Sequence, residues 1–189
     1  RQMCIRDIIT SLKKNIVVSG SHVKTTTTSL IASIFAKAKL DPTIINGGVI
    51  NSLENSAKLG KSEWSILESD ESDGSFVKVP STYAVVTNID REHMDYYKSL
   101  NELKKHFIKF MLKVPSFGKT FVCSDDKNIK DICKISKIKN ILTYGFINNS
   151  NFKIKNLSFQ KNKSVFDVEM CLPNKKKTIL KKFEIPLIG

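Results

Sequence analysis

A short apolar segment runs into a glycine-containing turn and then into a Lys-Thr pair, an arrangement that can hold the phosphates of a nucleotide. The segment spans residues 17–28, with Gly20 in the turn and Lys24 and Thr25 opening an expected helix. Backbone N–H groups of such a turn and the positive helix end bind phosphate oxygens, the lysine reaches the outer phosphates, and the next hydroxyl ligates magnesium. Taken alone, the same residues could form an ordinary strand-to-helix turn capped by threonines.

Val23 stands where such a turn normally carries glycine. Glycine lets the backbone approach phosphate and tolerates dihedral angles that cost a β-branched residue about 1–3 kcal/mol. Either the turn adopts a β-type conformation that valine accepts, or the phosphate cradle is impaired. We hypothesise that Val23 narrows the cradle and weakens nucleotide affinity.

Two acidic groups stand out in a chain whose formal net charge is +13. The first group is Glu68, Asp70, Glu71 and Asp73, and the second is Asp90, Glu92 and Asp95 around His93. Clustered carboxylates in a basic background indicate a cation site. Each group alone could be a solvated loop, and His93 alone could be a surface or core histidine. Their common setting, each after an apolar strand, favours one shared site.

The elements that must position these residues are short apolar strands alternating with helices. We expect strands at 16–18, 43–45, 64–67, 84–87, 120–123 and 141–144, and helices at 25–39, 100–112 and 128–135. Such strands are typical of a mainly parallel sheet buried on both faces, and therefore of the α/β class. The phosphate turn and both acidic loops follow strands, so they are expected to converge at the carboxyl edge of the sheet.

The two ends of the chain follow other patterns. Apolar residues in 2–13 have helical spacing, and residues after 151 alternate like antiparallel strands, which predicts a small antiparallel sheet appended to the parallel core. The chain starts at Arg1 and stops at Gly189 without a polar tail. We expect it to be a fragment of a longer protein.

Composition bounds the remaining classes of protein. The lysines are spread along the chain without interleaved aromatic residues, so we expect no nucleic-acid partner, although charge alone favours one. No apolar run approaches the ~20 residues of a membrane span, and no signal sequence is evident, so we expect a cytoplasmic protein without a membrane partner. The four cysteines lack metal or redox spacing and are expected to be reduced and half-buried.

Taken together, the motifs resemble those of the Mur ligases, which add amino acids to the peptidoglycan precursor. The resemblance covers nearly the whole chain and rests on residues 20–30, 46–48, 67–76 and 85–95, in family order. Within the family, the sequence is most similar to the branch that joins L-alanine to UDP-N-acetylmuramate. A branch that recycles murein tripeptide shares the histidine-containing ATP loop, but Ser72, Gly74 and residues 87–90 favour the alanine-adding branch.

The resemblance implies ATP and Mg²⁺ as cofactors and gives roles to residues of the three loops. The ATP loop would consist of Gly20, Ser21, His22, Val23, Lys24, Thr25 and Thr26. Lys24 would contact the outer phosphates, and Thr25 and Glu68 would ligate a magnesium ion, Glu68 directly or through water. His93 would help to hold a second magnesium, and Asn88 would lie in the phosphate region, so Lys24, Asn88 and His93 are the implied catalytic residues.

Three acidic residues keep open roles under this resemblance. Asp70, Glu71 and Asp73 could orient the metal shell, contact substrate or shape their loop.

The implied reaction is ATP-dependent amide formation between L-alanine and UDP-N-acetylmuramate, through an acyl phosphate. Mur ligases have three domains, and residues 1–14 would end the first domain or form a linker helix. Residues 15–189 would form the central ATP-binding domain, incomplete at its carboxyl end, with 151–188 as its antiparallel part. The remaining Mur domains would be partners in cis, and we expect the chain alone to be inactive and to bind ATP weakly. A non-catalytic nucleotide-binding module remains an alternative because of Val23.

Overall fold

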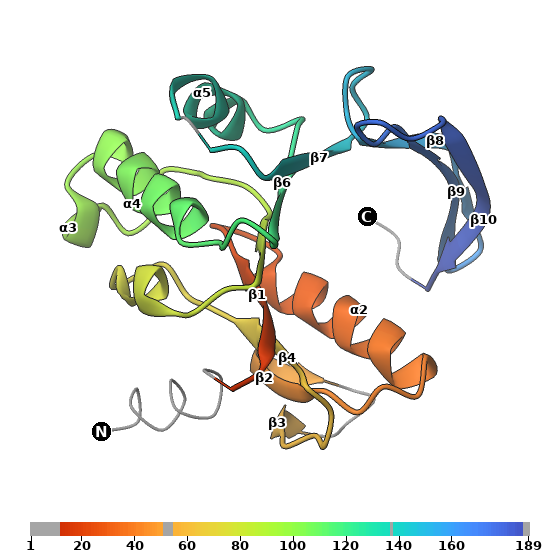
Figure 1. The fold of residues 1–189 in the computed structure, drawn as a ribbon, viewed down its shortest axis with the longest axis horizontal. Helices are drawn as coiled ribbons and strands as arrows, with labels where there is room; N and C mark the ends of the chain where they lie inside the picture. The colour runs from red at the N-terminus through yellow and green to blue at the C-terminus, as the bar shows by residue number, and fades with distance from the viewer. Residues whose placement is uncertain (1–11, 51–54, 137, 187–189) are drawn as a thin grey trace.

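Ten strands form one mixed sheet in the part of the chain that the computed structural model describes, residues 12–50, 55–136 and 138–186 (Figure 1). The strands are β1 (Lys14–Ser19), β2 (Thr43–Ile50), β3 (Asn55–Lys58), β4 (Trp64–Glu68), β5 (Tyr83–Val86), β6 (Lys119–Cys123), β7 (Ile141–Gly145), β8 (Phe152–Gln160), β9 (Lys163–Met170) and β10 (Thr178–Ile185). The helices are α2 (Lys24–Lys37), α3 (Met94–Tyr97), α4 (Leu100–Leu112), α5 (Lys127–Ile135) and the short 3-10 helix η1 (Ser75–Lys78).

The middle of the sheet is parallel, and both of its edges are antiparallel. The strand order is β10-β9-β8-β7-β6-β5-β1-β4-β2-β3. Neighbours from β2 to β8 run parallel, whereas β3 at one edge and β9 and β10 at the other pair antiparallel. This arrangement confirms the expected α/β fold with a mainly parallel sheet and antiparallel strands after it.

The register of the central strands decides where the loops meet. Val18 lies opposite Glu68, and Ser19 lies opposite Val86, so β1, β4 and β5 reach the same edge of the sheet. Because these strands are parallel neighbours, the loops that follow them start side by side. The phosphate turn and the two acidic loops are therefore brought together by strand order alone.

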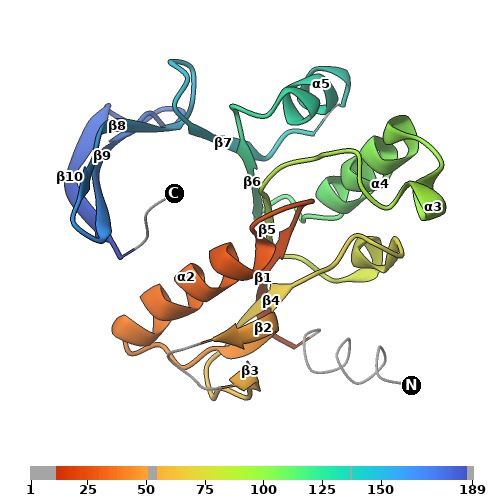
Figure 2. The same ribbon diagram turned by 180° about the vertical axis from the view of Figure 1, so that it is seen from behind.

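Helices cover both faces of the parallel strands. On one face α2 packs through Ala32 against Ile44 and Ile66. On the other face, α4 and η1 bury Phe107 and Phe76 against strand residues that include Val17. Figures 1 and 2 show α2 on one side of the sheet and α4 and α5 on the other. Residues of the central strands thus point alternately into two cores, as a sheet buried on both faces requires.

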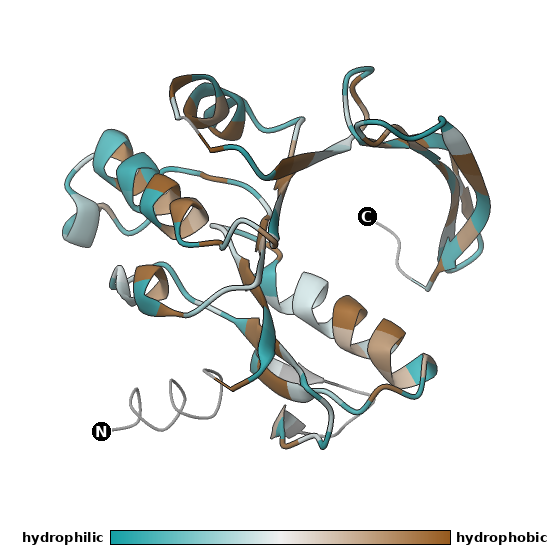
Figure 3. Ribbon diagram, in the orientation of Figure 1, coloured by the Kyte–Doolittle hydropathy of each residue, from teal (hydrophilic) through white to brown (hydrophobic). Residues whose placement is uncertain are grey.

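Helices α4 and α5 begin at side-chain caps that agree with their sequences. The Ser99 hydroxyl accepts a hydrogen bond from the Glu102 N–H at 3.2 Å, and the Asp126 carboxylate accepts one from the Ile129 N–H at 2.7 Å. Such caps satisfy N–H groups that have no partner within the helix. Figure 3 shows hydrophobic and hydrophilic residues mixed along both helices, which is typical of helices with one buried face.

The antiparallel strands continue the sheet. Strand β8 pairs parallel with the end of β7, with Tyr144 opposite Phe152, and then antiparallel with β9. Figure 2 shows β8, β9 and β10 as a curved extension at one end of the molecule. The register shifts between Lys155 and Ser158 in β8 and between Leu180 and Phe183 in β10. Such irregularities bend strands and increase their twist.

Several boundaries differ from the expected ones. Strand β2 extends to Ile50, and α2 ends at Lys37 rather than at residue 39, because Lys39 has a left-handed φ of 57° that stops the helix. Strand β3 and helices η1 and α3 were not expected, because four-residue segments carry too few apolar positions for a clear periodicity. The helix expected over 2–13 lies almost entirely outside the described residues.

Three of the four cysteines, Cys123, Cys133 and Cys171, are half-buried and free in the described part of the chain, as expected, while Cys4 lies outside it. Within the described residues, no helix combines the length and apolar character needed to cross a membrane.

Candidate functional site

A pocket of about 470 Å³ lies at the carboxyl edge of the parallel strands, where β2, the end of β4 with the loop after it, and the segments after β1 and β5 meet. Its lining residues come from all four segments and are Lys24, Thr25, Ile45, Asn46, Gly47, Glu68, Asp70 and His93. Pockets that bind small molecules are typically about 300–1,000 Å³ in volume. The pocket thus has room for part of a nucleotide and combines cationic, hydroxyl and carboxylate groups.

The turn after β1 is held by the loop after β5. The backbone N–H of His22 donates to the Asn88 Oδ1 at 2.8 Å, and the Thr87 hydroxyl donates to the His22 carbonyl at 2.7 Å. Gly20 has a φ of 144°, and a Cβ there would lie 2.1 Å from the Thr87 Oγ1. Glycine is therefore required at position 20. Asn88 does not line the pocket but fixes the shape of the turn.

Ser21 and His22 make further contacts with the same loop. The Ser21 hydroxyl accepts a hydrogen bond from the Asp90 N–H at 2.8 Å. The His22 ring lies 3.4 Å from an Asp90 carboxylate oxygen and 3.7 Å from one of Glu92. The pKa of Asp90 is lowered, first by the hydrogen bond from the Arg91 N–H and then by His22. The His22 side chain thus pairs with carboxylates outside the pocket lining.

Val23 occupies the residue position just before α2 in a left-handed conformation, with φ 57° and ψ 19°. The alternative that the turn takes a β-type conformation there is therefore wrong. Left-handed backbone costs an L-residue about 1–2 kcal/mol because Cβ crowds the following carbonyl. The side chain of Val23 is 59% exposed, and Thr26 is also exposed, in the first turn of α2.

The ammonium group of Lys24 has an acceptor for each of its three protons. Its Nζ donates to the Gly20 carbonyl at 2.8 Å, to the Ser21 carbonyl at 3.3 Å and to the Glu71 Oε2 at 2.7 Å. The side chain is only 14% exposed. An ammonium has three donors and no acceptor, so a phosphate oxygen can join this group only by replacing one of the three.

Thr25 and Glu68 are adjacent in the lining of the pocket. The Thr25 hydroxyl donates to the Glu68 Oε1 at 3.0 Å, and the Glu68 Oε2 accepts the Gly47 N–H at 2.7 Å. A Cβ at Gly47 would lie 2.8 Å from the Glu68 carboxylate, so a larger residue there would displace the end of that side chain. The buried Asn46 Oδ1 nearby has no hydrogen-bond partner among the described residues. Hydroxyl, carboxylate and amide oxygens are the hard ligands that suit Mg²⁺.

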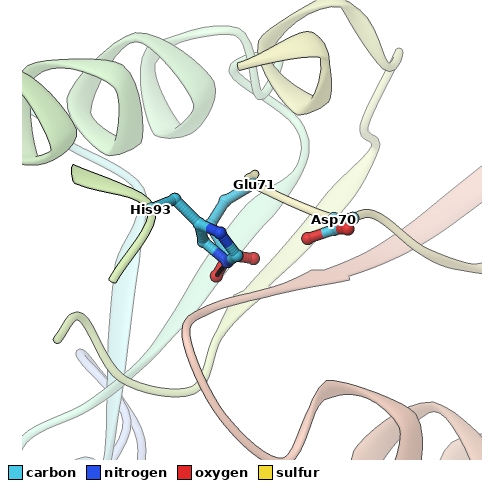
Figure 4. A group of neighbouring side chains, drawn as sticks. All are labelled: Asp70, Glu71 and His93. Carbon is cyan, nitrogen blue, oxygen red and sulfur yellow. Dashed lines mark ion pairs between the residues drawn. The ribbon is translucent and has the colours of Figure 1, made fainter. Parts of the chain in front are cut away.

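Asp70, Glu71 and His93 form a second group in the same region (Figure 4). One ligand atom from each lies within 4.8 Å of the others, and the His93 Nε2 lies 3.5 Å from the Glu71 Oε1. Burial acts to raise the pKa of Asp70, but two hydrogen bonds from Ser72 and the charge of Lys24 outweigh it, so the pKa is lowered. Asp70 therefore keeps its negative charge beside Lys24, 3.9 Å away.

The structure brings most of the expected site residues to one place. Lys24, Thr25, Glu68 and His93 line the same pocket, and the turn of Gly20, Ser21, His22 and Val23 lies beside it. Of the three residues with open roles, Asp73 is exposed and accepts the Ser75 N–H at 2.9 Å, which shapes the loop. The functional roles of all these residues stay predictions.

Sequence reasoning gave no role to Asn46 and Gly47 and left that of Glu71 open. The Asn46-Gly47 pair lies within β2, directly after its apolar residues, which could have indicated that this strand contributes to the same edge. The complete burial of Glu71 has no signal in the sequence, because its neighbours along the chain are polar.

Sequences of known proteins align with this chain over nearly its whole length. Residues 18–189 match the family model described as Mur ligase middle domain. The chain is 64% identical over 181 residues to the UDP-N-acetylmuramate--L-alanine ligase of Pelagibacter ubique (strain HTCC1062), and 43% identical over 180 residues to the enzyme of that name from Rickettsia bellii (strain OSU 85-389). These alignments cover 96% and 94% of this chain but 39% and 38% of the relatives. The chain thus spans about two fifths of their length.

A solved structure shares the fold. The UDP-N-acetylmuramate-alanine ligase MurC from Thermotoga maritima superposes with a TM-score of 0.79, covering 100% of this chain and 41% of that one. At 20% sequence identity, this likeness supports the fold alone. The family model and the sequence relatives establish more: this chain belongs to the Mur ligase family, and residues 18–189 correspond to its middle domain.

Proposed function

We propose that this chain is the ATP-binding part of a ligase that joins L-alanine to UDP-N-acetylmuramate. The observation that carries the proposal is the meeting of Lys24, Thr25, Glu68 and His93 in one pocket, from three segments far apart in the sequence. The choice of substrates follows the printed name of the relative with 64% identity.

The residues of the pocket fit ATP and Mg²⁺. When bound, ATP supplies the phosphoryl group that turns the substrate carboxylate into an acyl phosphate, which the amine of L-alanine attacks with loss of phosphate. The turn of Gly20 to Thr26 holds the phosphates, and the Thr25 hydroxyl and Glu68 carboxylate, 3.0 Å apart, hold the magnesium ion. The carboxylate oxygens of Glu68 line the pocket and are of the type that Mg²⁺ prefers as ligands.

Charge neutralisation and alignment are the tasks left to the protein. The Lys24 ammonium offsets the negative charge of the outer phosphates, and His93, which lines the same pocket, supports a second magnesium ion near the substrate carboxylate. Asn88 keeps the turn in shape through the His22 N–H. Holding the reactants in line is worth several kcal/mol of activation free energy in such reactions, roughly 7–11 at the upper end.

A non-catalytic nucleotide-binding module is the second candidate. Two observations favour it: the left-handed Val23 in the turn and the complete set of acceptors around Lys24. This candidate predicts ATP binding without turnover.

The test is an assay of the full-length protein for ADP release. We expect release that requires Mg²⁺, L-alanine and UDP-N-acetylmuramate together, and an amide product. Lys24→Met should abolish it, whereas Lys14→Met, which changes an exposed lysine paired with Glu63, should leave it intact. ATP binding without ADP release would support the non-catalytic module. ADP release with murein tripeptide in place of L-alanine would support the recycling branch.

A further inference from the structure

The carboxylate of Glu71 lies between Lys24 and His93, two residues of the pocket lining. Its Oε2 accepts from Lys24 at 2.7 Å, and its Oε1 lies 3.5 Å from the His93 Nε2 (Figure 4). We propose that Glu71 is a positioning residue that holds Lys24 and His93 in the places where phosphoryl transfer needs them. The proposal rests on the ligase function proposed above.

Burial strengthens the ion pair between Glu71 and Lys24. The side chain of Glu71 is 0% exposed, and its Oε1 has no hydrogen-bond partner among the described residues. A buried carboxylate is stable only when cations or donors compensate its charge. Lys24 supplies that compensation, and His93 lies nearest to the remaining oxygen. Glu71 therefore cannot release both residues without leaving a charge buried and unpaired.

The loop that carries Glu71 is itself fixed in place. The Tyr97 hydroxyl donates a hydrogen bond to the Glu71 carbonyl, and the Gly74 N–H donates to the same carbonyl at 3.0 Å. Tyr97 is buried against the core formed with α4. Because His93 immediately precedes α3, the five residues from His93 to Tyr97 include both the imidazole that faces Glu71 and the tyrosine that holds its carbonyl. The backbone of Glu71 is thus anchored to the segment that supplies one of the partners of its carboxylate.

The three acceptors of Lys24 differ in strength. The contact with Glu71 is between opposite charges and is the shortest at 2.7 Å, whereas the Ser21 carbonyl is the most distant at 3.3 Å. The bond to Glu71 joins two full charges, whereas each bond to a carbonyl joins one charge and a dipole, so the bond to Glu71 is the strongest of the three. A phosphate oxygen should therefore replace a carbonyl, and Lys24 should keep Glu71 when the nucleotide is bound.

The kinetic test uses Glu71→Gln in the full-length protein. The amide keeps the shape of the side chain but loses its charge, so Lys24 and His93 lose their common anchor. We expect kcat to fall at least tenfold while KM for ATP changes less than threefold, because the backbone of the turn still binds the phosphates. Glu71→Asp keeps the charge and should retain more activity than Glu71→Gln.

Glu169→Gln is the matched control. Glu169 in β9 is also a buried carboxylate with two basic neighbours, Lys155 at 2.8 Å and Lys177 at 3.0 Å, but it lies far along the sheet from the pocket. Glu169→Gln should lower the free energy of unfolding without changing kcat. The proposal is overturned if Glu71→Gln leaves kcat unchanged, lowers it no more than Glu169→Gln does, or raises KM in proportion.

A structural readout tests the same proposal without relying on turnover. In crystals of the wild-type protein with magnesium and a non-hydrolysable ATP analogue, Lys24 Nζ should lie within about 3.2 Å of both Glu71 and a phosphate oxygen. A lysine that has left Glu71 for the phosphate would overturn the proposal, even if the wild-type protein shows alanine-dependent ADP release. Absence of that release in the wild type would overturn the ligase function and leave this distance to decide the role of Glu71.

Discussion

Val23 has a β-branched side chain on a left-handed backbone, a combination that is unfavourable for L-residues. A valine with a φ of 57° is strained, yet its neighbours are tightly fixed: the His22 N–H and carbonyl are both bonded to the loop after β5. The surrounding contacts therefore impose the left-handed conformation, and the turn keeps its shape with an unfavourable residue in it. Backbone strain of this kind clusters at functional sites. Val23 is therefore expected to affect both the free energy of unfolding and the affinity for nucleotide.

Val23→Gly should relieve this strain and open the turn to phosphate. We expect the free energy of unfolding to rise by up to about 1 kcal/mol, because glycine accepts the left-handed region but loses more entropy on folding. ATP affinity should rise roughly three- to tenfold, measured by isothermal titration calorimetry.

Lys39→Gly provides the control for this prediction. Lys39 has the same φ of 57° but follows α2, at the opposite end of that helix from the turn. Lys39→Gly should raise the free energy of unfolding, as Val23→Gly does, without affecting ATP affinity. Equal affinities of the parent protein and Val23→Gly would contradict the proposed effect of Val23.

At the scale of elements, the short helix α3 links the second acidic loop to the first. Tyr97 is buried and donates its hydroxyl proton to the Glu71 carbonyl. Burial and then the nearby Glu71 charge raise the pKa of Tyr97 above its ordinary value. The folded protein therefore holds this proton more tightly than the unfolded chain does.

This linkage predicts a loss of stability at high pH. The contribution of Tyr97 is fully present below the ordinary phenol pKa of about 10 and is lost as the pH rises through that value toward the raised one. Tyr97→Phe should lower the free energy of unfolding by about 1 kcal/mol at neutral pH and weaken its fall between about pH 9 and 11. Denaturant titrations over this range measure both effects.

The neighbouring tyrosine supplies the control. Tyr96→Phe changes an exposed side chain on the same helix that raises the pKa of Tyr97 less than burial and Glu71 do, so it should keep most of the wild-type pH dependence. Tyr144, whose pKa is also raised by burial, is unchanged in all three proteins and so does not contribute to the difference. The same pH dependence in wild type and Tyr97→Phe would refute the role given to this hydrogen bond.

Sequence periodicity predicted the elements whose apolar residues are many and regularly spaced. Helix α4 matches its expected bounds because Leu103, Phe107, Phe110 and Met111 form one buried face. Strand β3, with the sequence NSAK, carries no such pattern, and its place depends on pairing with β2. Such pairing is a property of the folded sheet, so short polar elements cannot be read from local sequence alone.

At the scale of the whole molecule, strand order explains the site. The central order β5-β1-β4-β2 brings residues of β2 and the segments that follow β1, β4 and β5 to one edge, although these residues are up to 73 positions apart, from Gly20 to His93. The sequence predicted Lys24, Thr25, Glu68 and His93 as one group, because each follows an apolar strand. It did not predict that Glu71 is buried between Lys24 and His93, because that contact depends on how the loop after β4 folds back.

The central claim is that these loops form a single nucleotide and metal site. It is tested most directly by a crystal structure of the protein with Mn²⁺ and a non-hydrolysable ATP analogue, in which anomalous scattering locates the metal. We predict a manganese ion at about 2.1 Å from Thr25 Oγ1, bound to Glu68 directly or through one water, with a terminal phosphate oxygen at about 3 Å from Lys24 Nζ. A nucleotide bound elsewhere, or a metal ion more than about 5 Å from both Thr25 and Glu68, would contradict the claim.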